Sequence, residues 1–218
     1  MLTIPKRVLL QAVLAAGAGL FLSGTAPAIA ASPAGTAPEA ALPAIAEMAI
    51  GNPDAKVTIV EYSSFTCPHC AVFEKEVFAP LKRDFIDSGK VRFVFREAYT
   101  HRYGLWASMV ARCDGGSGRF FGIAHMMFDK QDEWLRKDDA GAVMADLRKF
   151  GLVAGLEAGA IDACMKDEAK AKALVGWYQA NMAADGVEAT PTLIVNGKAH
   201  SNLGYDKLKE LLEAELAR

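Results

Sequence analysis

The sequence has no basic surplus and no block of like charges. Its 24 lysines and arginines are balanced by 26 aspartates and glutamates, which gives a formal net charge of −2 at pH 7. Proteins that bind nucleic acid usually carry a basic patch or stripe, so we expect no nucleic-acid partner. The composition is 52% hydrophobic and 23% charged, which is typical of globular proteins and argues against a disordered, collagen-like or coiled-coil chain.

After the first thirty residues the sequence also has no long apolar run. The N-terminus itself combines Lys6-Arg7, an apolar stretch from Val8 to Leu22, and the small-residue site Ala28-Ile29-Ala30. This pattern is typical of a secretory signal peptide. The alternative, a membrane anchor, is disfavoured because the apolar run is shorter than the ~20 residues that a span needs. We therefore predict a signal peptide over 1–30, cleaved near Ala30, and a periplasmic protein.

Cysteine is scarce, with four residues in the chain. All four follow the predicted cleavage site, and an exported compartment allows disulfides to form and persist. They are too few to act as a disulfide scaffold, and the apolar content is sufficient for a true core. We therefore expect these cysteines to perform chemistry or to bridge local segments. They are Cys67, Cys70, Cys113 and Cys164.

The hydrophobic pattern predicts one α/β domain with a helical interruption. Residues 31–50 are rich in Ala and Pro and are predicted to be a flexible lead-in. Strands are predicted over 56–62, 91–95, 192–195 and a short run ending at 202, with a tight turn at Asn196-Gly197. Helices are predicted over 68–85, with a kink at Pro80, and over 206–216. Between 99 and 186 every pattern is helical, over 105–112, 120–128, 140–150, 156–165 and 168–184. The predicted domain therefore consists of 51–98 and 187–218, with an all-helical insertion over 99–186.

Cys67-Pro68-His69-Cys70 lies where a predicted strand ends and a helix begins. The first N–H groups of a helix have no intrahelical partner, and the helix dipole adds partial positive charge there. A thiolate at Cys67 would be stabilised by both, and a donor at His69 would favour it further. Pro68 fits the first helical position because its missing N–H costs nothing there. A lowered pKa makes Cys67 a ready nucleophile and a good leaving group, and the spacing lets Cys70 close a disulfide with it.

A metal site is the alternative for a Cys-x-x-Cys pair. Zinc needs two more ligands at suitable spacing, whereas Cys113 and Cys164 are single and the sequence has no second such pair. His101, His125 and His200 also lack ligand spacing. A copper-chaperone loop normally lacks a proline between its cysteines. We therefore predict thiol redox chemistry without metal or cofactor, and a metal-binding protein remains the alternative from another functional class.

The sequence resembles the DsbA-like branch of the thioredoxin superfamily. The matching stretches are Thr58–Cys70, Ala189-Thr190-Pro191-Thr192 and Gly204-Tyr205, and the resemblance covers about 50–218. It implies a thioredoxin-like fold with an all-helical insertion and a cis peptide bond at Thr190–Pro191 beside the cysteines. It also implies an exported thiol–disulfide oxidoreductase that acts on reduced secreted proteins and is reoxidised by a DsbB-like membrane protein.

The resemblance also bears on Glu61, which it aligns with the acidic residue beneath the active site, a proton acceptor for Cys70. The alternative for Glu61 is a solvent-facing position on its strand. Some DsbA homologues carry a second bridge in the helical insertion, which favours a structural disulfide between Cys113 and Cys164. Two buried free thiols are the alternative for that pair.

The identity of residue 190 does not decide whether the protein is an oxidase or an isomerase or reductase. The best-known DsbA oxidases carry Val before the cis-proline, whereas Thr is similar to the disulfide isomerases and several DsbA homologues. Isomerases are usually held as dimers or trimers by an additional N-terminal module, and the lead-in over 31–50 is too short to be one. We therefore predict a monomeric oxidase that introduces disulfides into secreted proteins, with an isomerase or reductase of the same fold as the alternative.

Overall fold

The computed structural model describes residues 41–114, 116–137 and 139–218, so the predicted signal peptide lies outside the described residues. The strands in these residues form one mixed sheet of order β1-β3-β2-β4-β5. β2 and β3 pair in parallel, and the other neighbours pair antiparallel. The strands are β1 (Met48–Gly51), β2 (Val57–Ser63), β3 (Val91–Glu97), β4 (Thr192–Val195) and β5 (Lys198–Ser201).

Strand β1 corrects the predicted flexible lead-in over 31–50 at residues 48–50, whereas 31–40 lie outside the described residues. Its register pairs Met48 with Phe95 and Gly51 with Arg92. Met48 is buried, while the residues after it become progressively more exposed. Four residues are too few to show a convincing alternation of apolar and polar side chains. The strand forms because β3 offers it a pairing edge, which local sequence does not reveal.

The helix that begins at Pro68 is less regular than the pattern predicted. It consists of α1 (Pro68–Phe73), a π-helical segment (Glu74–Phe78), α2 (Ala79–Leu81) and a second π-helical segment (Lys82–Ile86). The backbone remains in the right-handed helical region on both sides of Pro80, and a π-helical segment lies on either side of α2. A proline removes one hydrogen bond of the α-helical ladder, and π-helical turns are a known way for a helix to absorb such an irregularity.

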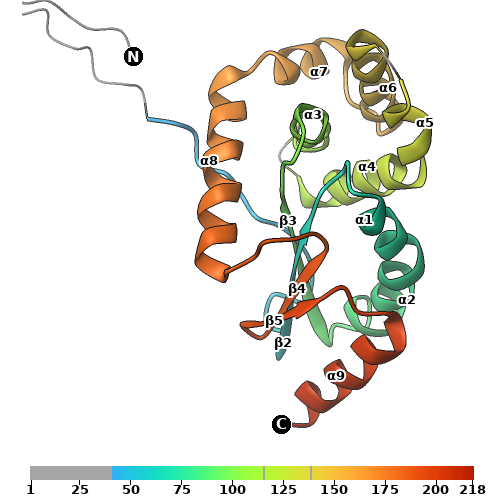
Figure 1. Cartoon of the computed structure of the whole chain (residues 1–218), viewed down its shortest axis with the longest axis vertical. Coiled ribbons are helices and arrows are strands. Elements are labelled where there is room, and N and C mark those ends of the chain that lie inside the picture. Colours follow the sequence, from blue (N-terminus) through green and yellow to red (C-terminus); the bar gives the residue numbers. More distant parts are fainter. Residues whose placement is uncertain (1–40, 115, 138) are drawn as a thin grey trace, which may run out of the picture. The chain divides into compact units, whose positions relative to one another are not determined.

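Between β3 and β4 the described residues form helices and no strands. Figure 1 shows α3 to α7 gathered at the carboxyl ends of β2 and β3, and α8 running back beside the sheet towards β4. α5 was not predicted, because five residues cannot show a helical period. These helices are α3 (Arg102–Ala111), α4 (Ser117–Asp129), α5 (Gln131–Leu135), α6 (Ala140–Val153), α7 (Ala158–Met165) and α8 (Glu168–Asp185). None of the helices in the described ranges is long and apolar enough to cross a membrane.

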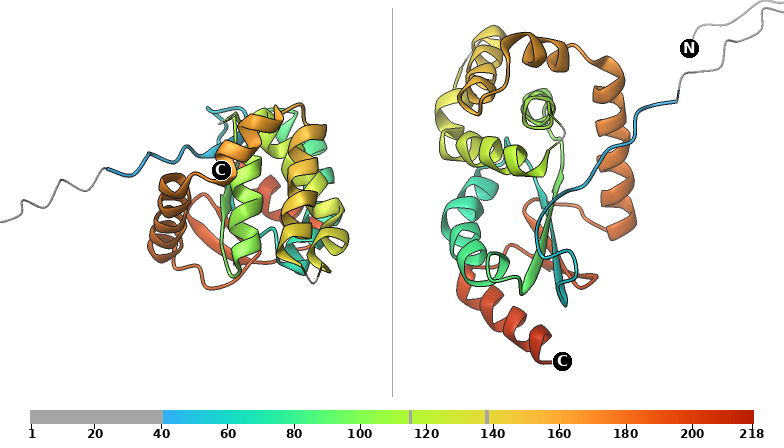
Figure 2. Two further views of the ribbon diagram at one scale, coloured as in Figure 1. Left: turned by 90° about the horizontal axis from the view of Figure 1, so that it is seen from above. Right: turned by 180° about the vertical axis from the view of Figure 1, so that it is seen from behind.

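The two faces of the sheet carry different cores. On one face, Val57 and Ile59 pack in the main cluster with residues of α1, α4 and α9 (Tyr205–Ala217). On the other face, Tyr62 packs with Ile194 and with residues near the end of α8. Because side chains alternate along a strand, Glu61 shares the face of Ile59. The view from behind in Figure 2 shows α9 at the opposite end of the sheet from the helical insertion.

An aromatic cluster attaches the insertion to the sheet. Phe65, just after β2, stacks on Phe95 of β3 with ring centroids 5.7 Å apart. Phe120 and Phe128 of α4 lie 6.4 and 5.1 Å from Phe65. All four side chains are at most 4% exposed, and burying a side chain of this size stabilises the fold by roughly 1.5–3 kcal/mol. The segment leading to the cysteines is therefore held from both the sheet and the insertion.

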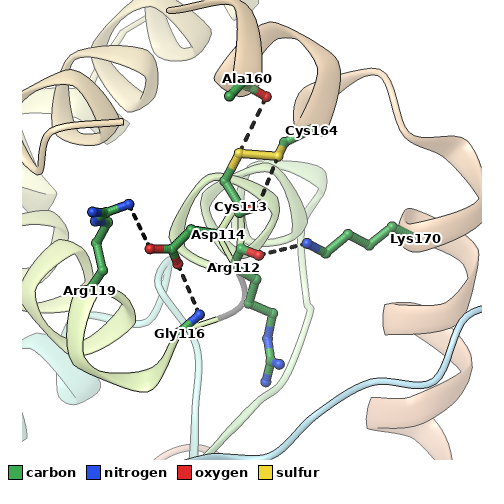
Figure 3. The surroundings of a disulfide bond; sticks show 8 residues. All are labelled: Arg112, Cys113, Asp114, Gly116, Arg119, Ala160, Cys164 and Lys170. Carbon is green, nitrogen blue, oxygen red and sulfur yellow. Dashed lines mark hydrogen bonds and ion pairs between the residues drawn. A yellow bond between two sulfur atoms is a disulfide. The ribbon is translucent and has the colours of Figure 1, made fainter. Parts of the chain in front are cut away.

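Cys113 and Cys164 form a disulfide, which the sequence had left open against two free thiols. The bridge joins the turn after α3 to the last turn of α7, as Figure 3 shows. Cys113 lies beyond the last residue of α3. The described cysteines at 67 and 70 are free.

Candidate active site

Cys67 is the N-cap residue of α1, at the junction that the sequence predicted. Its backbone is extended, with φ −91° and ψ 120°, and Pro68 follows at the start of the helix. The carbonyl oxygen of Cys67 accepts hydrogen bonds from the N–H groups of Cys70 (3.1 Å) and Ala71 (3.3 Å). Cys67 is half-buried and Cys70 is 0% exposed. The pair therefore has one sulfur at the surface and one beneath it.

The surroundings of the two thiols drive their pKa values apart. The pKa of Cys67 is lowered to about 5, mainly by a hydrogen bond from the Cys70 thiol, with further contributions from the Thr190 side chain and from the backbone N–H groups of Cys70 and His69, while burial opposes the shift. The pKa of Cys70 is raised, mainly by this same hydrogen bond, and also by burial and by the charge of Glu61. At neutral pH the favoured state is a Cys67 thiolate beside a Cys70 thiol.

His69 departs from the expectation that its side chain would donate to the thiolate. The imidazole is exposed, and among the described residues no hydrogen bond joins it to Cys67. The contribution of His69 to the lowered pKa of Cys67 comes from its backbone N–H. This is the donor that any residue at this helical position would offer, so the direct contact belongs to the helix end rather than to the histidine ring.

The loop before β4 completes the site from the far end of the chain. The Thr190–Pro191 peptide bond is cis, as the resemblance implies. The Cys67 thiol donates to the carbonyl oxygen of Thr190, with 3.4 Å between the sulfur and that oxygen. β4 pairs Thr192 with Tyr62 of β2, which sets the loop beside the end of β2. Two segments more than a hundred residues apart in sequence therefore meet at one sulfur.

Glu61 lies beneath the cysteines and is 2% exposed, so the solvent-facing alternative is wrong. Its Oε2 atom is buried and has no hydrogen-bond partner among the described residues. Burial raises the pKa of Glu61 to about 8, the charge of Glu74 adds to the shift, and the Ser63 hydroxyl opposes it. A carboxyl group that titrates near neutral pH is able to take up or release a proton during thiol chemistry.

Gln131 was not among the residues predicted from the sequence, and it is 4% exposed. Its Nε2 atom donates to the carbonyl oxygens of Phe65 (2.9 Å) and Cys67 (3.0 Å). Gln131 is the first residue of α5, the short helix that showed no periodic pattern. A single polar residue in such a segment gives no sign that it is buried against a distant loop, so no signal in the sequence could have found it.

A groove of about 440 Å³ opens beside α1. Pro68, Ala71 and Val72 line the side near the cysteines, and His125 and Phe128 of α4 contribute to the opposite side. Val72 is 48% exposed. An exposed apolar side chain therefore lies beside the cysteines, and no pattern in the sequence identifies it.

Glu74 and His125 connect this groove to a second one of about 540 Å³, which Ile50, Phe78 and Phe121 help to line. The His125 Nδ1 atom lies 3.1 Å from Glu74 Oε1. Burial raises the pKa of Glu74, and His125 opposes the shift. The acidic side chain of Glu74 therefore lies between the apolar surface at Val72 and the apolar side chains of the second groove.

No cluster of three or more histidine, cysteine or acidic side chains that could hold a metal occurs in the part of the chain that the structure describes. His101 instead caps α3, accepting a hydrogen bond from the N–H of Tyr103. His200 lies on β5 and its Nε2 atom is buried without a partner among the described residues.

Comparisons with known proteins agree with this geometry. A family model described as Thioredoxin matches residues 44–214. Disulfide bond formation protein D of Bacillus subtilis is 30% identical over 173 residues, covering 77% of this chain and 76% of that protein. A Rickettsia bellii protein with the provisional name of protein-disulfide oxidoreductase is 29% identical over 167 residues, covering 77% of this chain. This chain spans only 63% of the Rickettsia protein's length.

A solved structure has the same fold. The crystal structure of Wolbachia pipientis alpha-DsbA1 superimposes with a TM-score of 0.73 at 23% sequence identity, covering 81% of this chain and 94% of that one. The fold is therefore thioredoxin-like, with helices inserted between β3 and β4, as the resemblance implied.

Proposed function

This chain belongs to the thioredoxin family, in its DsbA-like branch, and on that premise we propose that it is an exported thiol–disulfide oxidoreductase. It works as an oxidase that introduces disulfides into secreted proteins through Cys67 and Cys70. The observation that carries the proposal is the set of donors around the Cys67 sulfur, which lower its pKa to about 5. Stabilising the thiolate stabilises the reduced protein, and this makes the Cys67–Cys70 disulfide a stronger oxidant.

The reaction begins with the Cys67–Cys70 disulfide. A substrate thiolate attacks the Cys67 sulfur, a bond forms between the two, and the bond to Cys70 breaks with its electron pair left on Cys70. A second substrate thiolate then attacks the substrate sulfur of this mixed disulfide, and Cys67 leaves as a thiolate. The substrate has lost two electrons and gained a disulfide, and the protein has gained two electrons as one thiolate and one thiol.

Glu61 supplies the proton balance at the buried sulfur. When Cys70 is released, the neutral Glu61 carboxyl group gives it a proton, and when the pair is reoxidised the carboxylate accepts that proton back. The support for this role is the position of Glu61 under the cysteines and its pKa of about 8. His69 acts through its backbone N–H, which helps to lower the pKa of Cys67.

The substrates we propose are reduced secreted proteins with an extended segment near the thiol. Thr190 is half-buried beside Cys67, and a peptide lying along the Thr190–Pro191 loop would place its thiol at the exposed sulfur. The exposed Val72 offers apolar surface on the other side. We further propose that the protein is a periplasmic monomer, cleaved near Ala30, and that a DsbB-like membrane protein reoxidises it.

The deciding experiment measures the reduction potential of the Cys67–Cys70 pair together with two activities. One is the oxidation of a reduced dithiol peptide, and the other is the refolding of scrambled ribonuclease. An oxidase gives a potential close to the oxidising end of the family range and oxidises the peptide faster than it repairs the ribonuclease, and the Cys67→Ser variant does neither. A strongly reducing potential, or repair without net oxidation, would favour the isomerase or reductase alternative.

The metal content of the purified protein distinguishes a metal-binding role from the proposed thiol redox function. Stoichiometric zinc or copper bound through Cys67 and Cys70, together with no redox activity, would overturn the proposal. Metal-free protein that exchanges disulfides would support it.

A further inference from the structure

Gln131 belongs to the helical insertion, but its side chain contacts the segment that leads to Cys67. We propose that Gln131 is a positioning residue that holds the carbonyl groups of Phe65 and Cys67, so that the first turn of α1 directs its N–H groups at the Cys67 sulfur. This inference rests on the proposed thiol chemistry and assigns the insertion a part in it.

The geometry uses both N–H bonds of one amide group. Gln131 Nε2 lies 2.9 Å from the carbonyl oxygen of Phe65 and 3.0 Å from that of Cys67. An amide nitrogen has two donors, and each is directed at one carbonyl. The two carbonyl groups flank the residue that leads into Cys67, so Gln131 restrains the loop on both sides of Thr66.

The carbonyl oxygen of Cys67 also connects Gln131 to the helix end. The same oxygen accepts the N–H groups of Cys70 and Ala71, which begin α1. The orientation of this peptide unit therefore decides where the first turn of α1 points. The backbone N–H groups of His69 and Cys70 contribute to the lowered pKa of Cys67, so a rotation of the peptide unit weakens their interaction with the thiolate.

Burial makes this restraint effective. Gln131 is 4% exposed and Phe65 is 1% exposed, so water does not replace the amide donors without a rearrangement. A buried carbonyl oxygen that loses its donor favours a reorientation of the chain that finds another one. Replacing the amide with an apolar side chain should therefore move the loop and not merely leave a gap.

The test uses Gln131→Leu, which keeps the approximate size of the side chain and removes both donors. We expect the pKa of Cys67, measured by thiolate absorbance against pH, to rise by about one unit, a tenfold fall in the ionisation constant. The equilibrium constant of the cysteine pair with glutathione should become less oxidising by up to about tenfold, since the thiolate is less stabilised. Gln131→Asn, which has the amide on a shorter side chain, should give a shift in the same direction and serves if the leucine variant does not fold.

Trp134→Phe is the matched control. Trp134 lies in the same short helix, is 1% exposed, and its Nε1 donates to the carbonyl oxygen of Met127 at 2.8 Å. Removing that donor should lower the melting temperature and leave the pKa of Cys67 unchanged. The proposal is overturned if the Gln131 variants lose stability but keep the pKa and the glutathione equilibrium, or if Trp134→Phe shifts both as strongly. The titration needs no substrate, so its outcome is separate from whether the wild-type protein is an oxidase.

Discussion

The two cysteine pairs of this chain lie at opposite ends of helices. Cys67 caps the N-terminal end of α1, where backbone N–H groups and the positive end of the dipole face the sulfur. Cys113 follows the C-terminal end of α3, and Cys164 lies in the last turn of α7. The negative end of a helix dipole disfavours a thiolate. The same side chain therefore meets an opposite electrostatic field in the two places.

The neighbouring atoms reinforce the difference. The Cys70 thiol, the Thr190 side chain and the backbone N–H groups of Cys70 and His69 all lower the pKa of Cys67. Around the other pair, shown in Figure 3, the carbonyl oxygen of Ala160 lies 3.3 Å from Cys113 Sγ, and the carboxylate of Asp114 is the next side chain in sequence. Thiolates are the reactive species and the leaving groups in disulfide exchange. The surroundings thus favour a thiolate at Cys67 and disfavour one at Cys113 and Cys164, in agreement with the proposed roles of the two pairs.

The largest expected effect is a separation of the two pairs in a redox titration. In glutathione buffers of increasing reducing strength, Cys67 and Cys70 should become reduced while Cys113 and Cys164 stay bonded. We expect equilibrium constants that differ on the order of a hundredfold or more, because only the first pair yields a stabilised thiolate. Alkylation followed by mass spectrometry of the peptides reads out each pair. Simultaneous reduction of both pairs would show that helix ends do not control the difference.

The second expected effect is on stability and separates structure from chemistry. Replacing Cys113 and Cys164 together with alanine opens a loop of 51 residues. The chain-entropy model, whose mechanism is disputed, assigns about 4 kcal/mol to a loop of this length, or a fall of about 10 °C in melting temperature for a chain of this size.

Peptide oxidation by the same double variant should stay within about twofold of the wild type, since neither sulfur takes part in the reaction. Cys67→Ser is the reciprocal variant, and it should fold with an unchanged melting temperature within a few degrees and lose the activity. A double variant with full stability, or one without activity, would contradict the division between the pairs.

Much of the fold was predictable where the pattern is long or the turn chemistry is specific. β4 was predicted residue for residue at Thr192–Val195, because it precedes the Asn196-Gly197 turn. β1 and α5 were missed, because four and five residues are too short to show a period. Both are held by tertiary contacts, with β3 in the first case and with the active-site loop in the second.

The contacts of the candidate site were predictable where the residues involved are close in the sequence. Cys67 and Cys70 share one helical turn, so their proximity follows from spacing alone. That Thr190 reaches Cys67 came from family resemblance, because local sequence does not place two segments 123 residues apart in contact. His69 is near Cys67 in sequence, yet its ring is exposed. The sequence placed a donor at the right position but did not give the direction of its side chain.

The third prediction concerns Glu61, which has no counterpart at the bonded pair. The pKa of this carboxyl group is about 8 in the folded protein and near 4.5 without burial. Because folding raises this pKa, the contribution of Glu61 to the free energy of unfolding is complete below pH 4.5. That contribution is lost as the pH rises towards 8. In Glu61→Gln this loss should disappear, so the variant gains stability relative to the wild type as the pH rises through this range, by on the order of a few kcal/mol at most.

Denaturant unfolding of the reduced proteins at pH 5 and pH 9 measures the effect, and Asp114→Asn is the control. Asp114 is an exposed carboxylate beside the other pair, paired with Arg119 at 2.7 Å, and its replacement should leave the pH dependence of stability unchanged above pH 5. Parallel pH curves for Glu61→Gln and the wild type would mean that Glu61 is already ionised at pH 5. Its assignment as proton acceptor for Cys70 would then fail.

The smallest expected effect comes from removing one donor at the reactive sulfur. Thr190→Val is nearly isosteric and deletes the hydroxyl group that helps to lower the pKa of Cys67, while the hydrogen bond from the Cys67 thiol to the backbone carbonyl of residue 190 is retained. The melting temperature should stay within a few degrees of the wild-type value, because valine fills nearly the same volume as threonine. The pKa of Cys67 should rise by only a few tenths of a unit, since Cys70 and two backbone donors remain, and the lifetime of the mixed disulfide should change with it.

Thr192→Val in the same loop removes a hydroxyl group that donates to the Ala189 carbonyl and does not touch the sulfur, so it controls for disturbance of the loop. Peptide oxidation measured beside refolding of scrambled ribonuclease shows whether the balance between the two activities shifts. If Thr190→Val matches Thr192→Val and the wild type in both rates and in reduction potential, residue 190 contributes packing alone, and the donors that distinguish the reactive pair are those of the helix end and of Cys70.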